Sequence, residues 1–391
     1  MKIVFFCIPA HGHTNPTLGV VRELISRGHE VWYYSYNAFR EKIEASGARF
    51  ISCDAYDQEQ RLSPEDAARI GGDLAFSAKI LVETTLALDE MVCCDMAALQ
   101  PDCIVADSMA VWGKAAARKL GVPFVSSTTT FAFNRYSAQI MPQKTKDLLK
   151  MLLAMPRANH YVRQLQKRGY PIRNILDIIS NDDTTHTIVY TSPEFQPMAD
   201  TFPGAYYSFV GPSIRPSKYD FVKTGRKLIY ISMGTVNNAM LPFYKACIAA
   251  LKDTTWQVVI SVGDQIPVDV FGAVPENISI YPSVDQIAIL AEADVFLTHC
   301  GMNSVSEALY FGVPLILNPK TKEQEGVAAR VAQLDAGVYL SQESADGILM
   351  AMNTVSDDTR YRKNADMIAR SFQNSSGAHG AADKILQVCR K

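Results

Sequence analysis

The 391-residue sequence lacks the features that mark several large classes of protein. Its apolar runs are shorter than a bilayer span, and the apolar start Met1–Ala10 leads into His11-Gly12-His13 without a signal-peptide cleavage pattern. The formal net charge is only −2, so nothing in the overall charge favours nucleic acid or an anionic membrane as a partner. We therefore expect a cytoplasmic protein with no membrane span, no nucleic-acid partner and, by default, a monomeric state.

Cysteine and metal-binding patterns are equally sparse. The eight cysteines include no pair with zinc-ligand spacing and form no recognisable framework, although their even number is weak evidence for disulfides. They are typical of small buried side chains in a reducing compartment. His11 and His13 could in principle bind a metal, but no other His, Cys or acid accompanies them locally, so we expect no metal site.

Two common nucleotide motifs are also missing. No Gly-x-Gly-x-x-Gly follows the first expected strand, and no Gly-Lys-Ser/Thr loop occurs. These absences disfavour NAD(P)-dependent enzymes and P-loop nucleotide hydrolases.

What is present is an alternation of short β-branched or aromatic runs with amphipathic stretches, which is typical of βαβ units and a parallel sheet. Hydrophobic residues make up 48% of the chain, enough for two cores. We expect an α/β protein with two facing, doubly wound, Rossmann-like domains and ligands in the cleft between them. The expected strands are Lys2–Ile8, Val31–Tyr34, Arg49–Ser52, Cys103–Ala106, Phe124–Ser127, Thr187–Thr191, Leu228–Ser232, Val258–Val262, Ile278–Tyr281, Val295–Thr298 and Pro314–Asn318.

A cluster of Pro and Gly between Gly211 and Gly225 is the best candidate for a linker. We therefore divide the chain into an acceptor-side domain (1–211), a linker (212–226), a nucleotide-side domain (227–372) and a C-terminal helix (373–391). We expect the whole tail from Asp357 to Lys391 to be helical, and its last part to pack back on the first domain.

The stretch Thr298–Glu307 carries the clearest chemistry. A strand ends near Thr298, a glycine lets the backbone turn, and a helix begins near Asn303, whose free N–H groups and dipole attract an anion. His299, Asn303 and Ser304 could donate to phosphate, and Glu307 could accept from ribose hydroxyls. His299 taken alone is better explained as a histidine that satisfies its loop, but the convergence of polar groups favours an anion site.

Two further stretches suit a sugar nucleotide. After the strand Pro314–Asn318, Glu323 and Gln324 place an acid beside an amide, a pair that suits several hydroxyls of one sugar ring. Judged alone, a solvated charged loop explains this pair equally well. The small residues Gly234 and Thr235 follow another strand and could approach a diphosphate, which is a weak signal by itself.

The first loop could supply a general base. A histidine at the carboxyl end of the first strand titrates near neutral pH, and Asp107 ends a strand of the same sheet, so the two could meet. A histidine simply exposed to water is the more ordinary explanation of this loop. We expect the following helix to begin at Asn15, with Pro16 at its first position.

These stretches, in this order and spacing, resemble the macrolide-type glycosyltransferases of bacteria, within the UDP-glycosyltransferase family. The resemblance spans the chain and is most specific from Thr298 to Pro314; the segment His11–Leu18 is similar to the family's opening loop. It implies two facing Rossmann-like domains (the GT-B type), a catalytic base at His13 and an orienting acid at Asp107. It implies nucleotide-sugar contacts at Gly234, Thr235, Val284, Gln286, His299, Gly301, Asn303, Ser304, Glu307, Glu323 and Gln324.

The sequence departs from the family pattern in two places. The element that usually begins with an aromatic residue, whose face stacks on uracil, here reads Ser283-Val284-Asp285-Gln286, with Tyr281 nearby. Glu323 stands where many members have Asp, which leaves the sugar open.

The resemblance predicts inverting hexosyl transfer, with glucose from UDP-glucose as the expected donor and neither cofactor nor metal. The expected acceptor is a hydroxyl of an apolar natural product. A UDP-sugar epimerase of the same architecture and a non-catalytic sugar-nucleotide-binding protein are the alternatives. Apolar residues that could line an acceptor pocket, or simply belong to the core, are Leu74, Phe76, Ile80, Leu81, Phe131, Phe133 and Met141.

Overall fold

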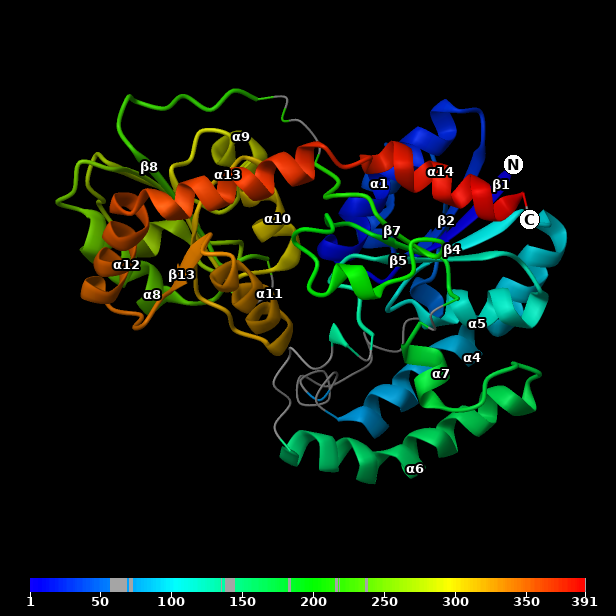
Figure 1. The fold of residues 1–391 in the computed structure, drawn as a ribbon. Helices are drawn as coiled ribbons and strands as arrows, with labels where there is room; N and C mark the ends of the chain where they lie inside the picture. Colours follow the sequence, from blue (N-terminus) through cyan, green and yellow to red (C-terminus); the bar gives the residue numbers. More distant parts are fainter. Residues whose placement is uncertain are drawn as a thin grey trace. The chain divides into compact units, whose positions relative to one another are not determined.

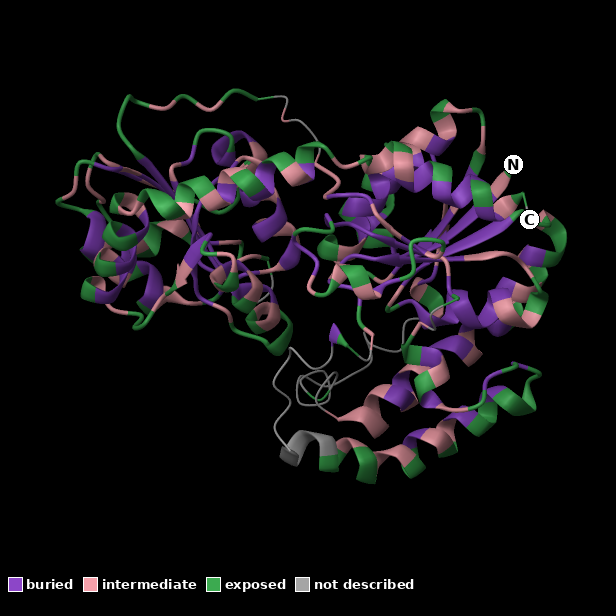
Figure 2. Ribbon diagram, viewed as in Figure 1, coloured by how far each residue is buried: buried purple, intermediate pink, exposed green. Residues whose placement is uncertain are grey.

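The computed structural model describes residues 1–56, 69, 73–134, 136–137, 145–181, 184–214, 217, 219–235 and 238–390. The chain forms two compact units (Figure 1). The first contains Met1–Ser213 together with Ser376–Lys391, and the second contains Ile214–Ser375. Each unit is built around its own parallel sheet, whose strands are the most buried segments in Figure 2.

The first unit contains a seven-stranded parallel sheet in the order β3-β2-β1-β4-β5-β6-β7. Its strands are β1 (Lys2–Phe6), β2 (Glu30–Ser35), β3 (Arg49–Ser52), β4 (Cys103–Asp107), β5 (Phe124–Thr128), β6 (Thr187–Val189) and β7 (Tyr207–Phe209). The order reverses between β1 and β4, so the loops that follow these two strands open a crevice at the carboxyl edge of the sheet.

The helices of the first unit cover both faces of this sheet. They are α1 (His11–Ser26), α2 (Arg40–Glu44), α4 (Leu74–Leu99), α5 (Val111–Leu120), α6 (Thr145–Lys167), α7 (Ile175–Ile179) and α14 (Gly377–Cys389), with 3₁₀ turns at Asn37–Phe39, Asp54–Tyr56 and Ala199–Thr201. The C-terminal helix α14 lies beside α1, and its Ala381, Ala382 and Ile385 are buried in the same core as β1.

The start of α1 differs from the expectation. The helix begins at His11, with Ala10 as N-cap, instead of beginning after Asn15. The backbone N–H groups of His13 and Thr14 donate to the Ala10 carbonyl at 3.0 and 2.9 Å. Pro16 therefore lies inside the helix and removes one backbone hydrogen bond from it. The preference of proline for the first helical position, on which the prediction rested, does not take into account the stability of the remaining turns. As a result His13 is held on a helical turn and not on a loop.

The second unit contains a six-stranded parallel sheet in the order β10-β9-β8-β11-β12-β13. Its strands are β8 (Leu228–Ser232), β9 (Gln257–Ser261), β10 (Ile278–Tyr281), β11 (Val295–Thr298), β12 (Leu315–Leu317) and β13 (Gly337–Tyr339). Its helices are α8 (Leu241–Leu251), α9 (Gln286–Leu290), α10 (Met302–Tyr310), α11 (Lys322–Gln333), α12 (Ala345–Asp357) and α13 (Thr359–Gln373), with a 3₁₀ turn at Val268–Phe271. The order reverses between β8 and β11, so this sheet also has a crevice at its carboxyl edge.

Both sheets confirm the predicted α/β class and parallel strand order. The tail is not one helix, because α13 ends at Gln373 and α14 starts at Gly377 after a short break. Within the described residues, no helix combines the length and the apolar character needed to cross a bilayer.

Candidate active site

His13 and Asp107 meet at the crevice of the first sheet. His13 lies on the first turns of α1, directly after β1, and Asp107 is the last residue of the adjacent strand β4. The His13 Nδ1 atom lies 2.8 Å from Asp107 Oδ2. The Asp107 side chain is fully buried, whereas 17% of the His13 side chain is exposed. The structure thus brings together the two residues that the sequence suggested as base and orienting acid.

The surroundings of Asp107 fix its orientation. Its second oxygen, Oδ1, accepts a hydrogen bond from the backbone N–H of Met109 at 2.9 Å. Thr129, which follows β5, places its Oγ1 3.0 Å from His13 Nδ1. A carboxylate can only accept, so Nδ1 carries the proton and donates it toward Asp107. The neutral ring then leaves Nε2 as the atom able to accept a proton.

His11, on the same helical turn, has a different environment. Its Nδ1 lies 3.2 Å from Lys42 Nζ, and its ring packs on Phe39 with a centroid distance of 4.9 Å. Burial and the nearby Lys42 ammonium both lower the pKa of His11. His13, which has a carboxylate partner, is therefore the better base of the two. As for metals, none of the described residues form a group of three or more His, Cys, Asp or Glu side chains suited to a metal ion.

The crevice of the second sheet contains His299, which follows β11. The backbone turns at Cys300, a buried residue with a φ of 67°, and Gly301 is extended and serves as N-cap of α10. We expected the glycine to make the turn, and that expectation is wrong. A non-glycine residue in the left-handed region typically costs about 1–3 kcal/mol, a strain often found at functional sites.

Two glycines at this crevice are required by close contact with His299. A Cβ atom on Gly301 would lie 2.5 Å from His299 Nε2, and one on Gly234, whose φ is +80°, would lie 2.6 Å from the same atom. The loops after β8 and β11 therefore hold the imidazole between them. Burial lowers the pKa of His299 to about 4, so the ring is neutral at pH 7 and carries one N–H rather than a positive charge.

The start of α10 lies beside a hydrogen-bonded carboxylate. Gln286, the first residue of α9, donates through Nε2 to Glu307 Oε2 and more weakly to Ser304 Oγ at 3.4 Å. Tyr230 of β8 donates its hydroxyl to Gln286 Oε1 at 3.2 Å. Burial, with a smaller contribution from Asp285, raises the pKa of Glu307 to about 7. The structure thus brings together Gln286, Ser304 and Glu307 of the predicted set.

The raised pKa of Glu307 predicts a pH-dependent stability. Because its folded-state pKa of about 7 lies above the ordinary 4.5, its contribution is fully present below about pH 4.5 and is lost as pH rises through 7. Gln does not titrate, so Glu307→Gln keeps what wild type loses. We expect the free energy of unfolding of the variant, measured relative to wild type, to be about 1–3 kcal/mol higher at pH 8 than at pH 5. Urea unfolding at both pH values measures this gain. The exposed Glu292→Gln is the control, and equal pH dependence in wild type and Glu307→Gln would contradict the assignment.

Glu323 and Gln324 lie on the first turn of α11. Gln324 Oε1 accepts from the backbone N–H groups of Lys320 and Thr321 at 2.7 and 3.1 Å, and Thr321 Oγ1 accepts in return from the Gln324 N–H. This capping box uses the amide oxygen of Gln324, so its Nε2 is the atom left to face a ligand. Glu323 is exposed.

Comparison with known proteins decides the family. The model of the UDP-glucoronosyl and UDP-glucosyl transferase family matches residues 217–376. An NDP-glycosyltransferase of Bacillus licheniformis is 33% identical over 398 aligned positions, which cover 98% of this chain and 96% of that protein. The chain belongs to the UDP-glycosyltransferase family. It is a bacterial macrolide-type member, and the protein is a sugar transferase.

Solved structures agree with this family. The calicheamicin glycosyltransferase is 26% identical, has a TM-score of 0.85, and the match covers 100% of this chain and 98% of that one. The glycosyltransferase of kitacinnamycin has a TM-score of 0.86 at 23% identity, over 99% of this chain and 98% of that one, which confirms the predicted GT-B fold.

The element in which many members of the family carry a stacking aromatic residue lies before α9. Ser283 is exposed, Val284 is half-buried, and Asp285 caps α9 by accepting from the Ala288 N–H at 3.3 Å. Tyr281, at the carboxyl end of β10, has 45% of its surface exposed. Thr235 is also exposed, and it directly follows Gly234. These residues lie at the carboxyl edge of the second sheet with the rest of the predicted set.

Sequence reasoning missed several residues that hold the site in place. Thr129 contacts His13, and Tyr230 donates a hydrogen bond to Gln286. Both contacts join residues that are distant in the sequence, so no local sequence pattern predicts them. After β12, Lys320 Nζ contacts Asn318 Oδ1 at 3.0 Å and pairs with Glu343. Glu343 also accepts from Asn318 Nδ2 at 2.8 Å. This cluster fixes the segment that leads into α11.

Most of the apolar residues that we considered for an acceptor pocket belong to the core. Leu74 and Leu81 pack on the core formed by α4, α5, α6 and α7, and Ile80 is buried. Phe131 is buried and lies 5.4 Å from Phe195, measured between ring centroids. The ordinary explanation therefore holds for these four.

The other three candidates differ. The Arg69 guanidinium lies 4.2 Å from the centroid of the Phe76 ring. Phe133, just beyond β5, is 49% exposed. Met141 lies outside the described residues. Of the described candidates, Phe133 is the exposed one, and it follows shortly after Thr129, whose hydroxyl contacts His13.

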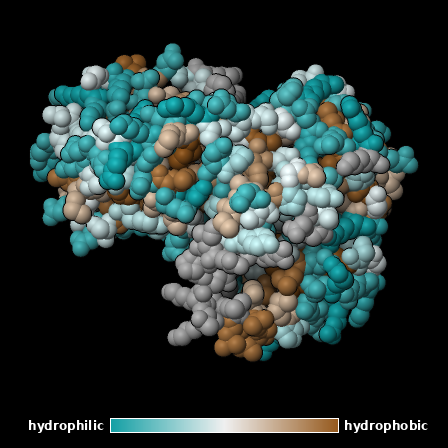
Figure 3. All heavy atoms as spheres, in the orientation of Figure 1, coloured by the Kyte–Doolittle hydropathy of each residue, from teal (hydrophilic) through white to brown (hydrophobic). Residues whose placement is uncertain are grey.

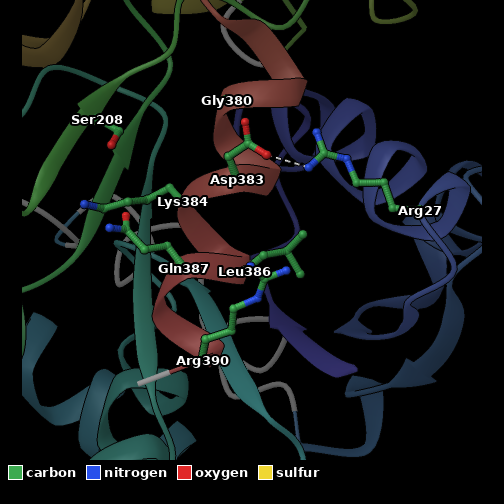
Figure 4. Close-up of a pocket in the computed structure, with 8 residues that line it drawn as sticks. All are labelled: Arg27, Ser208, Gly380, Asp383, Lys384, Leu386, Gln387 and Arg390. Carbon is green, nitrogen blue, oxygen red and sulfur yellow. Dashed lines mark hydrogen bonds and ion pairs between the residues drawn. The ribbon is translucent and has the colours of Figure 1, made fainter.

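A hollow of about 720 Å³ in the first unit is unrelated to the predicted site (Figure 4). It lies along α14, between that helix, the end of α1 and β7. Its lining residues are Arg27, Ser208, Gly380, Asp383, Lys384, Leu386, Gln387 and Arg390. The Lys384 ammonium donates to the Ala205 carbonyl at 2.7 Å and Arg27 pairs with Asp383, so the charges of this hollow serve to hold α14.

Proposed function

We propose that the protein transfers a hexose, glucose from UDP-glucose, to a hydroxyl of a small apolar natural product, with inversion at the anomeric carbon and without a metal ion. The observation that carries the proposal is the hydrogen bond from His13 Nδ1 to the buried carboxylate of Asp107, at the switch point of the first sheet. It leaves Nε2 as a base at the edge where ligands of such sheets bind.

In the proposed mechanism, Nε2 of His13 takes the proton of the acceptor hydroxyl as its oxygen attacks the anomeric carbon. Asp107 stabilises the imidazolium that forms and keeps the ring in the required tautomer, as the acid does in a Ser-His-Asp triad. The transition state resembles an oxocarbenium ion, and the bond to the diphosphate breaks as the new glycosidic bond forms.

The leaving diphosphate is met by groups of the second unit. His299, neutral because its pKa is about 4, donates an N–H, and the first turn of α10 at Asn303 and Ser304 supplies backbone N–H groups and the positive end of its dipole. Gly301 and Gly234 keep side-chain atoms away from the imidazole. Glu307 and Gln286 are the proposed contacts to ribose and base, and Glu323 and Gln324 those to the sugar.

The natural-product acceptor is supported by relatives. One solved relative, 26% identical, is named the calicheamicin glycosyltransferase, and another relative, from Streptomyces antibioticus, is named oleandomycin glycosyltransferase. A UDP-sugar epimerase, which would need no acceptor, is not favoured, because the relatives compared above are named transferases.

The test is incubation with UDP-glucose in EDTA, with and without a mixture of phenolic and macrolide alcohols. We expect UDP release only with acceptor present, and a product heavier by one hexose. Acceptor-independent conversion of the sugar would contradict transfer and support an epimerase. Loss of transfer in EDTA that Mg²⁺ restores would contradict the metal-independent mechanism. Transfer from another nucleotide sugar alone would contradict the UDP-glucose assignment.

A further inference from the structure

The long helix α6 carries a second apolar stripe that faces away from the core. Its inner side is formed by Ala158, Val162 and Leu165, which are buried in the core that α6 shares with its neighbours α4 and α7. On its outer side, Leu149, Leu152 and Leu153 are 58%, 57% and 70% exposed. Figure 3 shows apolar side chains gathered at this end of the helix. Leucines at i, i+3 and i+4 form one continuous stripe, so these three side chains act as a single surface.

The same helix is strongly basic. Its sequence has five lysines or arginines and one acid, Asp147, and no Asp or Glu follows from Leu149 to Lys167, although the whole chain has a net charge of −2. Its exposed cations are Lys150, Arg157, Arg163 and Lys167, and the exposed Arg168 follows directly after the helix.

Between residues that the structure describes, no ion pair joins an acid to these cations. Asp177 of α7 pairs with Arg118 and Arg173, and Glu83 of α4 lies 3.8 Å from Lys79. The positive charge of α6 therefore remains available to a partner.

We propose that this outer face of α6 docks the protein on an anionic lipid surface, with the three leucines inserted among the acyl chains and the cations on the headgroups. An exposed leucine stripe with lysine and arginine beside it is the pattern of helices that lie in the membrane interface. None of these residues belongs to the predicted site, and the proposal does not depend on the transferase activity.

Two other partners fit the surface less well. A second copy of the chain would cover the leucines but would bring the cations of both copies together, which is unfavourable. Nucleic acid would match the charge, but the leucines offer no stacking face or hydrogen bond to a phosphate or base. A lipid surface satisfies both the apolar and the charged part of the helix.

The test is sedimentation of the full chain with vesicles, either of pure phosphatidylcholine or with about 30% phosphatidylglycerol. We expect about tenfold or stronger binding to the anionic vesicles, weakened by salt. The variant Leu149→Ser/Leu152→Ser/Leu153→Ser should lose about tenfold or more of this binding. The variant Arg157→Gln/Arg163→Gln/Lys167→Gln should lose the preference for anionic vesicles.

Matched controls change equally exposed residues of the second unit. Met350→Ser/Met367→Ser replaces side chains that are 60% and 58% exposed, and Lys245→Gln/Lys252→Gln/Lys363→Gln removes an equal charge. Both controls should bind vesicles as wild type does, and circular dichroism should show all variants folded. Absence of vesicle binding, or binding that the α6 variants leave unchanged, would overturn the proposal. So would a dimer that the leucine variant dissociates, or DNA binding that outcompetes the vesicles.

Discussion

Replacing His13 by Ala is expected to lower the rate of transfer to alcohols by about 10²–10⁴-fold, the usual contribution of a general base. The variant removes the ring whose Nδ1 donates to Asp107 and whose Nε2 would accept the proton of the acceptor. Binding of UDP should remain as in wild type, because the predicted nucleotide contacts all lie in the second unit. Initial rates of UDP release and calorimetric titration with UDP measure the two effects separately.

The chain provides a matched control for this experiment. His11 lies on the same turn of α1 and contacts Lys42 and Phe39 without a carboxylate partner, so His11→Ala should keep near wild-type transfer. Asp107→Asn should lower the rate as well, since an amide can donate to Nδ1 and shift the proton to Nε2. If His13→Ala transfers at a rate close to that of wild type, the base is another residue.

The second large effect is expected from Gly301→Ala. The backbone at Gly301 is extended, with φ −62° and ψ 138°, so alanine is allowed there; the added Cβ would lie 2.5 Å from His299 Nε2 and displace the ring. We expect the variant to keep its fold and to bind UDP about tenfold or more weakly. The reason is that the N–H of the displaced His299 ring and the N-terminus of α10 no longer point at the same diphosphate. Calorimetric titration with UDP measures the loss.

A double-mutant cycle makes this test specific. If the clash acts through the imidazole, His299→Ala/Gly301→Ala should bind UDP no more weakly than His299→Ala alone. Gly204→Ala is the control, since a Cβ at Gly204 has no neighbour within 4 Å. Additive losses in the double variant, or unchanged UDP binding in Gly301→Ala, would show that contact with His299 is not the reason for the glycine.

Much of the fold could be predicted because each local signal agrees with the global structure. The runs at Lys2–Phe6, Cys103–Asp107 and Leu228–Ser232 are apolar, rich in β-branched or aromatic residues and buried, as central parallel strands require. The strands β7 and β13 were missed. Each has only three residues and lies at a sheet edge, and β13 begins with glycine, so neither has a recognisable pattern.

The candidate site was predictable where residues follow a strand directly. His13, Asp107 and His299 lie at strand ends that a parallel sheet necessarily gathers at one edge, and the family resemblance supplied their proposed roles. What could not be read is how side chains meet across the sheet. The left-handed turn at Cys300 and the hydrogen bond from Tyr230 to Gln286 depend on tertiary packing, for which the local sequence contains no signal.

The burial of α14 beside α1 has a consequence for the order of synthesis. The second unit is inserted into the first, because Ile214–Ser375 separates the N-terminal part of the first unit from its final helix. During translation the second unit is complete before Ala381, Ala382 and Ile385 leave the ribosome. The unit that begins first therefore finishes last, and until then the apolar residues of α1 and β1 that α14 covers lack this covering helix on the nascent chain.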